Sequence, residues 1–271
     1  MRDVRPRAAR LLTSVAISGL LAIAVAGCKT LETPETTGSL PLGTTASVGS
    51  TPEEQRDAEA WGARYRANPR DAEAAIQYAR RLRENGQRAQ AVAVLEQAAI
   101  RSPDDKRLLG AYGRALADVG NYSQALDVLG RAHSPDQPDW HILSAQGAVL
   151  DQMDRHDEAQ RYYQSALKIA PDEPSVLSNL GLSYALAKDL RKAEATLRRG
   201  VAQRNVDARV RQNLALVVGL QGRFAEAESI ARADLPPDQA AANVVYLKQM
   251  LTQHKDWKKL ARPVTAQNQG G

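Results

Sequence analysis

Few residues of this 271-residue chain could do chemistry by their type and spacing. Cys28 is the single cysteine, so no disulfide framework can form within the chain. The histidines lack the close spacing to each other and to carboxylates that a zinc site requires; they are His133, His141, His156 and His254. The sequence also has neither a GxxxxGK phosphate loop nor a GxSxG nucleophile elbow. We therefore expect no catalytic site, no metal site and no cofactor.

Cys28 lies between an apolar run and a polar stretch. A basic segment, MRDVRPRAAR, precedes the 17-residue run LLTSVAISGLLAIAVAG, which is short for a membrane span of about 20 residues. The residues Val25-Ala26-Gly27-Cys28 resemble the lipobox of bacterial lipoproteins, in which the cysteine is acylated and becomes the first residue. The resemblance implies a lipoprotein signal peptide at 1–27 and a lipid anchor on Cys28. An uncleaved membrane helix and a buried cysteine are the alternatives.

The stretch after Cys28 is rich in Thr, Ser, Gly and Pro and has neither helical nor strand periodicity. We interpret residues 28–51 as a flexible tether, for which a random coil has a root-mean-square reach of about 25 Å. Lys29 follows the cysteine, whereas aspartate at that place retains enteric lipoproteins in the inner membrane. The lipoprotein resemblance therefore implies an outer-membrane lipoprotein that faces the periplasm.

The composition favours helices and argues against nucleic-acid binding. Aromatic residues make up 4% of the chain and Phe occurs once, which disfavours a β-sandwich or a β-barrel. The formal net charge is +5, but residues 1–27 contribute +3 of it, so the rest of the chain is near neutral. A nucleic-acid-binding protein would carry a basic stripe with interleaved aromatic side chains. We expect an all-α protein with no nucleic-acid partner.

A period of 34 residues organises the chain between residues 72 and 241. Five blocks align without an insertion: 72–105, 106–139, 140–173, 174–207 and 208–241. The eighth residue of each block is small; these residues are Ala79, Gly113, Gly147, Gly181 and Ala215. The twentieth is always alanine, namely Ala91, Ala125, Ala159, Ala193 and Ala227. The fifteenth is glycine in three blocks, which predicts a turn between two helices at Gly86, Gly120 and Gly222.

This pattern resembles the tetratricopeptide repeat (TPR), in which small residues allow the two helices of a repeat to approach closely. The resemblance implies an all-α TPR solenoid, a right-handed superhelix with a concave surface. A helix that begins at Pro52 and a final helix after Pro236-Pro237 should cap its two ends, so the predicted solenoid spans residues 52–261. Residues 262–271 are expected to be disordered.

TPR domains bind protein segments mainly through one face of the first helix of each repeat. By this resemblance the candidate groove residues are Arg80, Arg83, Arg107, Arg114, Asn179, Leu182, Arg209, Gln212 and Asn213. The predicted groove is basic at one end and polar to apolar at the other, which suits a protein segment with some acidic residues. Asn179 and Asn213 resemble one element of the carboxylate clamp of chaperone-binding TPRs, but the full Lys, Asn and Arg set is absent. Ordinary solvated surface is the alternative for each of these residues.

A further resemblance covers nearly all of the chain after Cys28. The lipobox, the tether and the five repeats, with VRQNLALVVGLQGRFAEAESIARADL at 210–235 and AANVVYLKQML at 241–251, resemble the TPR lipoprotein of the tight-adherence (Flp) pilus assembly system. The resemblance implies an assembly factor that binds the pilus secretin or another pilus component. The alternative is a general cell-envelope adaptor for another secretion, outer-membrane assembly or peptidoglycan machine. The groove residues do not identify the partner.

Overall fold

The computed structural model describes residues 52–204 and 206–253. Within these ranges the chain forms twelve helices and no strand apart from an isolated bridge between Ser134 and Gln137. The helices are α1 (Pro52–Ala67), α2 (Ala72–Glu84), α3 (Arg88–Arg101), α4 (Lys106–Asp118), α5 (Tyr122–Arg131), α6 (Trp140–Gln152), α7 (His156–Ile169), α8 (Pro174–Leu186), α9 (Leu190–Val201), α10 (Ala208–Leu220), α11 (Phe224–Ala231) and α12 (Pro237–Gln253).

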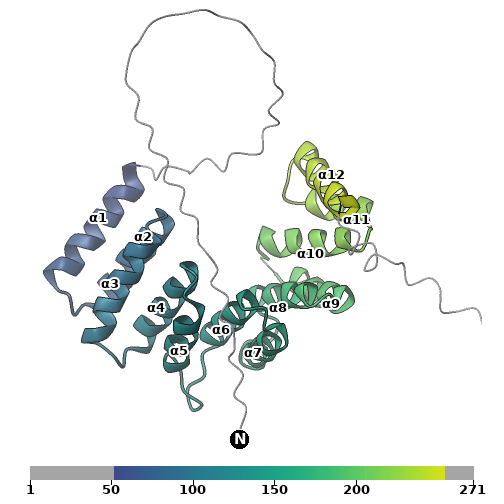
Figure 1. The fold of residues 1–271 in the computed structure, drawn as a ribbon. Helices are drawn as coiled ribbons and strands as arrows, with labels where there is room; N and C mark the ends of the chain where they lie inside the picture. Colours follow the sequence, from purple (N-terminus) through teal and green to yellow (C-terminus); the bar gives the residue numbers. More distant parts are fainter. Residues whose placement is uncertain (1–51, 205, 254–271) are drawn as a thin grey trace, which may run out of the picture. The chain divides into compact units, whose positions relative to one another are not determined.

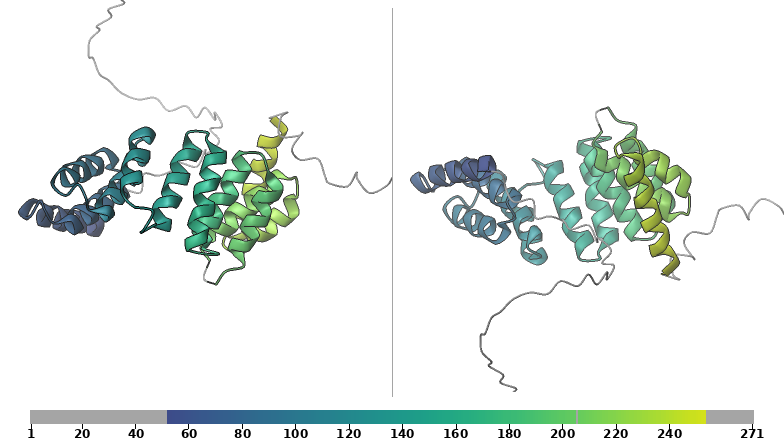
Figure 2. Two further views of the ribbon diagram at one scale, coloured as in Figure 1. Left: turned by 90° about the horizontal axis from the view of Figure 1, so that it is seen from below. Right: turned by 90° about the horizontal axis from the view of Figure 1, so that it is seen from above.

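The twelve described helices stack in the order of the sequence. Each helix packs against its sequence neighbours, and α2, α4, α6, α8 and α10 also pack one on the next. Figure 1 shows these five helices, the first of each repeat, on the inner side of a curved stack, with α3, α5, α7, α9 and α11 on the outer side. The views in Figure 2 show the same order of helices along the stack. The predicted fold class, an all-α solenoid of helix pairs, is confirmed.

A carboxylate caps the first helix of every repeat. Its oxygen accepts a hydrogen bond from a free backbone N–H of the first turn, at 2.8 Å for Asp139 and the N–H of His141 and at 3.0 Å for Asp105 and the N–H of Leu108. Such caps stabilise a helix by about 0.5–2 kcal/mol, and the positive end of the helix dipole adds to this. The five capping residues lie 34 positions apart; they are Asp71, Asp105, Asp139, Glu173 and Asp207.

The turn between the two helices of each repeat contains a residue with positive φ. Gly86, Gly120 and Gly222 have φ between 77° and 83°, as the glycine pattern predicts. The corresponding residues of the third and fourth repeats are Asp154, at φ 57°, and Lys188, at φ 66°. The residue after each of these donates its backbone N–H to a carbonyl five residues earlier, which closes the helix end. The turn is therefore maintained even where glycine is missing.

Small residues allow the two helices of a repeat to touch. A Cβ atom at Gly181 would lie 2.5 Å from Cγ of Leu197, and one at Gly147 would lie 2.7 Å from Cε1 of Tyr163. The five alanines at the twentieth position are also buried, none more than 2% exposed. Because interiors pack as densely as organic crystals, neither position has room for a larger side chain. The steric role predicted for these residues is confirmed.

Single helices cover both ends of the described stack. At one end α1 packs on α2, and at the other α12 packs on α10 and α11. None of the helices that the structure describes combines the length and the apolar character needed to cross a membrane. The predicted signal peptide, Cys28, the tether, His254 and the predicted segments beyond Gln253 lie outside the described residues.

Candidate functional site

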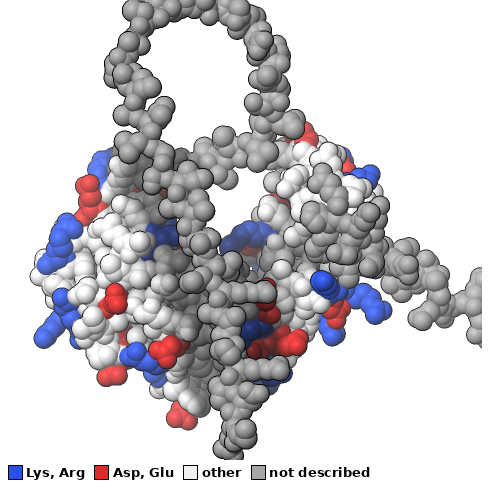
Figure 3. Space-filling model, in the orientation of Figure 1, with Lys and Arg blue, Asp and Glu red and all other residues white. Residues whose placement is uncertain are grey.

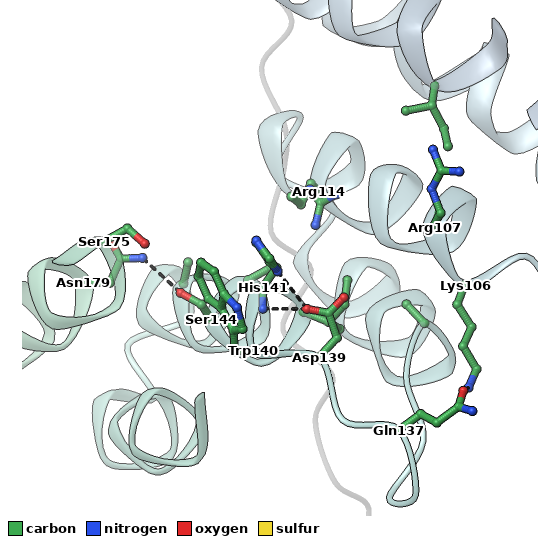
Figure 4. A pocket seen from close by; sticks show the side chains of 15 residues that line it. Lys106, Arg107, Arg114, Gln137, Asp139, Trp140, His141, Ser144, Ser175 and Asn179 are labelled. Atoms are coloured by element: carbon green, nitrogen blue, oxygen red, sulfur yellow. Dashed lines mark hydrogen bonds and ion pairs between the residues drawn. The ribbon is translucent and has the colours of Figure 1, made fainter. Parts of the chain in front are cut away.

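A pocket of about 750 Å³ opens between the first helices of successive repeats. We refer to it as the central pocket; most of its lining comes from α4, α6 and α8 (Figure 4). The lining residues are Ile76, Lys106, Arg107, Arg114, Ala132, Gln137, Asp139, Trp140, His141, Ile142, Ser144, Ala145, Ala148, Ser175 and Asn179. They combine positive charge, hydrogen-bonding side chains, one large aromatic ring and small apolar side chains.

A second pocket of about 610 Å³ lies between α2 and α4 and shares Ile76 and Arg114 with the central pocket. We refer to it as the arginine pocket because Arg80, Arg83 and Arg88 also line it. The structure therefore brings Arg80, Arg83 and Arg114 together at one site and Arg107 and Arg114 together at the next.

Two of the predicted groove arginines pair with carboxylates of the adjacent repeat. Arg83 on α2 forms an ion pair with Asp118 on α4, and Arg107 on α4 forms one with Glu73 on α2. Hydrogen bonds from Gln77 and then from Arg107 hold the pKa of Glu73 below its usual value, so this pair is ionised at neutral pH. These arginines hold neighbouring repeats together, and their charges are already balanced.

Two further predicted arginines pair with carboxylates that are close to them in the sequence. Arg80 Nε lies 3.0 Å from Glu84 Oε1 on the same helix. Arg209 lies 3.2 Å from the Asp207 carboxylate that caps α10. Such exposed pairs contribute little to stability, about 0–1 kcal/mol, yet they reduce the local positive charge. Much of the positive charge predicted for the basic end of the groove is therefore balanced by carboxylates, among them Glu84 and Asp118, which also lie on the first helices of their repeats.

Arg114 differs from these four arginines. Its guanidinium forms neither an ion pair nor a hydrogen bond with any of the described residues, although its side chain is only partly exposed. Burial, and then the charge of Arg83, lowers the pKa of Arg114, while Asp139 and Asp118 oppose the shift at longer range. An arginine stays protonated under such conditions, so an unbalanced cation lies between the two pockets.

The predicted asparagines also bind the adjacent repeat. Asn179 Nδ2 donates to Ser144 Oγ at 3.2 Å, and Asn213 Nδ2 donates to Ser178 Oγ at 2.8 Å. The two bonds join α8 to α6 and α10 to α8 with the same residue separation of 35. Each amide still has a carbonyl oxygen that could accept a hydrogen bond from a ligand.

The wall of the central pocket contains a stacked aromatic pair. The rings of Trp140 and His141 lie 3.6 Å apart at 22° (Figure 4). His141 Nδ1 lies 3.0 Å from Asp139 Oδ1. Burial raises the pKa of Asp139, but hydrogen bonds from the backbone and side chain of His141 outweigh this and lower it. Asp139 is thus an ionised cap with its partners in place, and the half-buried indole of Trp140 forms part of the pocket wall.

The last repeats form an apolar pocket of about 420 Å³ between α10, α11 and α12. The predicted groove residue Gln212 lines it beside Leu216, which is 42% exposed, and Tyr246, which is 65% exposed. The predicted groove residue Leu182 on α8 is half-buried and lines neither this pocket nor the central pocket. The structure therefore does not gather all nine predicted residues into one site.

A buried carboxylate that the spacing arguments did not single out joins the third and fourth repeats. Asp151 accepts hydrogen bonds from Tyr163 Oη at 3.0 Å and from Ser183 Oγ at 2.7 Å, and its Oδ1 lies 2.9 Å from His156 Nδ1. Burial and the adjacent Asp151 raise the pKa of Tyr163 far above its usual value. The cluster connects α6, α7 and α8 and faces no pocket described above, which indicates a structural role.

The visible part of the described surface carries charges of both signs (Figure 3). Figure 3 shows acidic and basic side chains interspersed over the visible face. Within residues 52–204 and 206–253, no group of three or more His, Cys, Asp and Glu side chains is placed to hold a metal ion.

The comparison with protein families agrees with the helix pairs and their spacing. The tetratricopeptide-repeat model matches residues 82–147 and 152–217. The folded part of this chain is a TPR solenoid. TPR solenoids are typically non-catalytic scaffolds, and TPR proteins generally bind protein partners.

Solved structures share the fold of this TPR chain at low sequence identity. A thermophilic TPR protein of Thermus thermophilus is 21% identical, with a TM-score of 0.55 over 61% of this chain and 90% of its own. The protein pilF of Pseudomonas aeruginosa is 16% identical, with a TM-score of 0.53 over 76% of this chain and 88% of its own. Cut9-Hcn1, an APC/C hetero-tetramer, is 19% identical, with a TM-score of 0.56 over 71% of this chain and 40% of its own. These likenesses show the fold alone. No curated protein sequence matches the chain.

Proposed function

We propose that this protein is a membrane-anchored TPR scaffold that binds protein partners of the tight-adherence (Flp) pilus machinery in the periplasm. The observation that carries the binding function is the mixed lining of the central pocket. Its volume of about 750 Å³ falls in the range of typical ligand sites, and the pocket is open along the inner side of the helix stack.

The chemistry of the central pocket suits a protein segment. Ala145 and Ala148 offer apolar contacts along α6, while Ser175 and Asn179 on α8 can hydrogen-bond to a peptide backbone. Because the side chains of Ala145 and Ala148 are short, they leave room for a peptide to lie across α6. A surface with small apolar side chains, one aromatic ring and hydrogen-bonding groups at its rim has the composition of a protein interface.

The membrane anchor and the pilus assignment rest on sequence features. Residues Val25 to Cys28 support lipidation, and the tether at 28–51 would let the solenoid extend about 25 Å from the membrane surface. The resemblance of residues 210–235 and 241–251 to the Flp-pilus TPR lipoprotein supports a pilus partner, with the secretin or another assembly component as the candidate.

The test is affinity capture of the full chain from cross-linked membranes, followed by identification of the bound proteins. The proposal expects a pilus component with the wild type and loss of that component with Ala148→Trp, because the indole would fill the exposed floor of the central pocket. Ala93→Trp is the matched control, since Ala93 is exposed on α3 and lines none of the pockets described above.

The outcomes separate the pilus role from a general one. Capture of another envelope machine would support the alternative adaptor function. The absence of any pilus component, together with normal piliation in a deletion strain, would reject the pilus assignment. If the Ala148→Trp and Ala93→Trp variants captured the pilus component equally well, the partner would bind to a surface other than the central pocket.

A further inference from the structure

We propose that Arg114 anchors an acidic side chain of the partner segment at the junction of the arginine pocket and the central pocket, and that the adjacent apolar surface receives the residue next to it. This inference rests on the proposed binding function and specifies the chemistry of the segment that binds.

Among the five predicted groove arginines, Arg114 is the one whose charge the described residues leave unbalanced. Arg88 also lines the arginine pocket without an ion pair among the described residues, but its side chain is exposed to water. Arg83 and Arg107 each have a carboxylate partner on the neighbouring repeat, and Arg80 has one on its own helix. The two carboxylates that attract Arg114 at longer range are already engaged, because Asp118 pairs with Arg83 and Asp139 caps α6. A carboxylate from a partner could therefore bind Arg114 without displacing an existing ion pair.

The position of Arg114 strengthens the attraction. The side chain lines both pockets and is partly buried, so less water screens its charge than at the exposed arginines. Gly110 precedes it by one helical turn, and a Cβ there would be in ordinary van der Waals contact with the guanidinium, 3.7 Å from its nearer terminal nitrogen. Figure 4 shows Arg114 on the pocket wall near Asp139 and His141. A planar guanidinium in this setting can bind a carboxylate through two parallel hydrogen bonds.

Apolar groups next to Arg114 define what should flank the acidic residue. Ile76 is half-buried and lines both pockets with Arg114, whereas Ile142 lines the central pocket but is only 3% exposed. A segment whose glutamate reaches Arg114 would therefore place its neighbouring side chain on aliphatic surface. The predicted partner motif is an acidic residue beside an apolar one, rather than a run of acidic residues.

The experiment compares two pools of short peptides with blocked termini, identical except for a central Glu in one pool and Gln in the other, each flanked by apolar residues. Binding to the full chain in detergent is measured by fluorescence anisotropy for the wild type, Arg114→Gln and Arg161→Gln. Arg161 is the matched control because it is exposed on α7 and lines none of the pockets described above.

The wild type should bind the Glu pool about tenfold more tightly than the Gln pool, as expected for one charge-assisted hydrogen-bonded pair. Arg114→Gln should remove this preference and keep the wild-type helical circular dichroism, while Arg161→Gln should retain the preference. Equal binding of both pools by the wild type, or an unchanged preference in Arg114→Gln, would overturn the anchor and leave the scaffold function standing. Binding of neither pool would overturn both the anchor and peptide binding by the groove.

Discussion

The buried carboxylate of Asp151 offers a quantitative test of how the solenoid is held together. Asp151 is 9% exposed, and the hydroxyl donors Tyr163 and Ser183 are 1% and 0% exposed. Replacing Asp151 by Ala removes the acceptor and leaves two buried hydroxyl groups without this partner. An unsatisfied buried group costs about 1–3 kcal/mol. We expect Asp151→Ala to lower the free energy of unfolding by about 2–5 kcal/mol, since the hydroxyls can reorient only in part.

A double-mutant cycle with Tyr163→Phe isolates one of these bonds. Tyr163→Phe alone removes a hydroxyl and leaves Asp151 with Ser183 and His156, so it should cost about 1 kcal/mol. In the double variant, the tyrosine hydroxyl that Asp151→Ala would leave without its acceptor is no longer present. The combined loss should therefore be smaller than the sum of the single losses by about 1–2 kcal/mol. Urea unfolding followed by far-ultraviolet circular dichroism measures all four proteins, and Asp127→Ala, at an exposed position of α5, is the control.

The hydrogen bonds that Asp151 accepts from α7 and α8 also affect how cooperative the unfolding transition is. Repeats in a solenoid unfold cooperatively only while their interfaces are strong. Because Asp151 joins the third repeat to Ser183 of the fourth, Asp151→Ala should broaden the transition as well as shift it. Strictly additive losses in the cycle, or an Asp151→Ala loss as small as that of Asp127→Ala, would refute the assignment of this carboxylate as the acceptor that satisfies the cluster.

Two further predictions rest on contacts of Gly181 and Tyr163, and a third rests on the sequence around Cys28. Gly181→Ala should lower the free energy of unfolding by about 1 kcal/mol, because the clash with Leu197 outweighs the gain in helix propensity; a higher melting temperature would contradict it. The raised pKa of Tyr163 keeps the hydroxyl protonated in the folded state, whereas the unfolded chain loses this proton above pH ~10. The free energy of unfolding should therefore fall above pH ~10 by about 1.4 kcal/mol per pH unit. Tyr163→Phe should lack this loss in urea titrations at increasing pH. Cys28→Ser should leave the melting curve unchanged and release the protein from the membrane fraction; continued palmitate labelling would reject the lipid anchor.

The turns show how far local sequence signals reach. Gly86, Gly120 and Gly222 predicted the turn in three repeats because glycine adopts positive φ without a Cβ clash. Asp154 and Lys188 adopt the same conformation, and neither residue type predicts it by itself. Their helix pairs hold the backbone in place through packing and hydrogen bonds, so the repeat spacing was the better guide there. The N-caps of the first helices, in contrast, could have been predicted from residue type. Acidic residues recur every 34 positions in the sequence, directly before each of these helices, where a carboxylate can cap the helix.

The groove shows what the repeat pattern could not supply. The sequence by itself determined the solenoid, because small residues at fixed positions force two helices together wherever the spacing recurs. It also determined which side chains lie on the first helices. Only the tertiary structure decided which of them are free: Arg83 and Asn179 bind residues 35 positions away, whereas Arg114 on the same surface has no such partner among the described residues. The reason is geometric, since stacking brings adjacent repeats into hydrogen-bonding range, and the exact side-chain pairs depend on how each helix is rotated against the next.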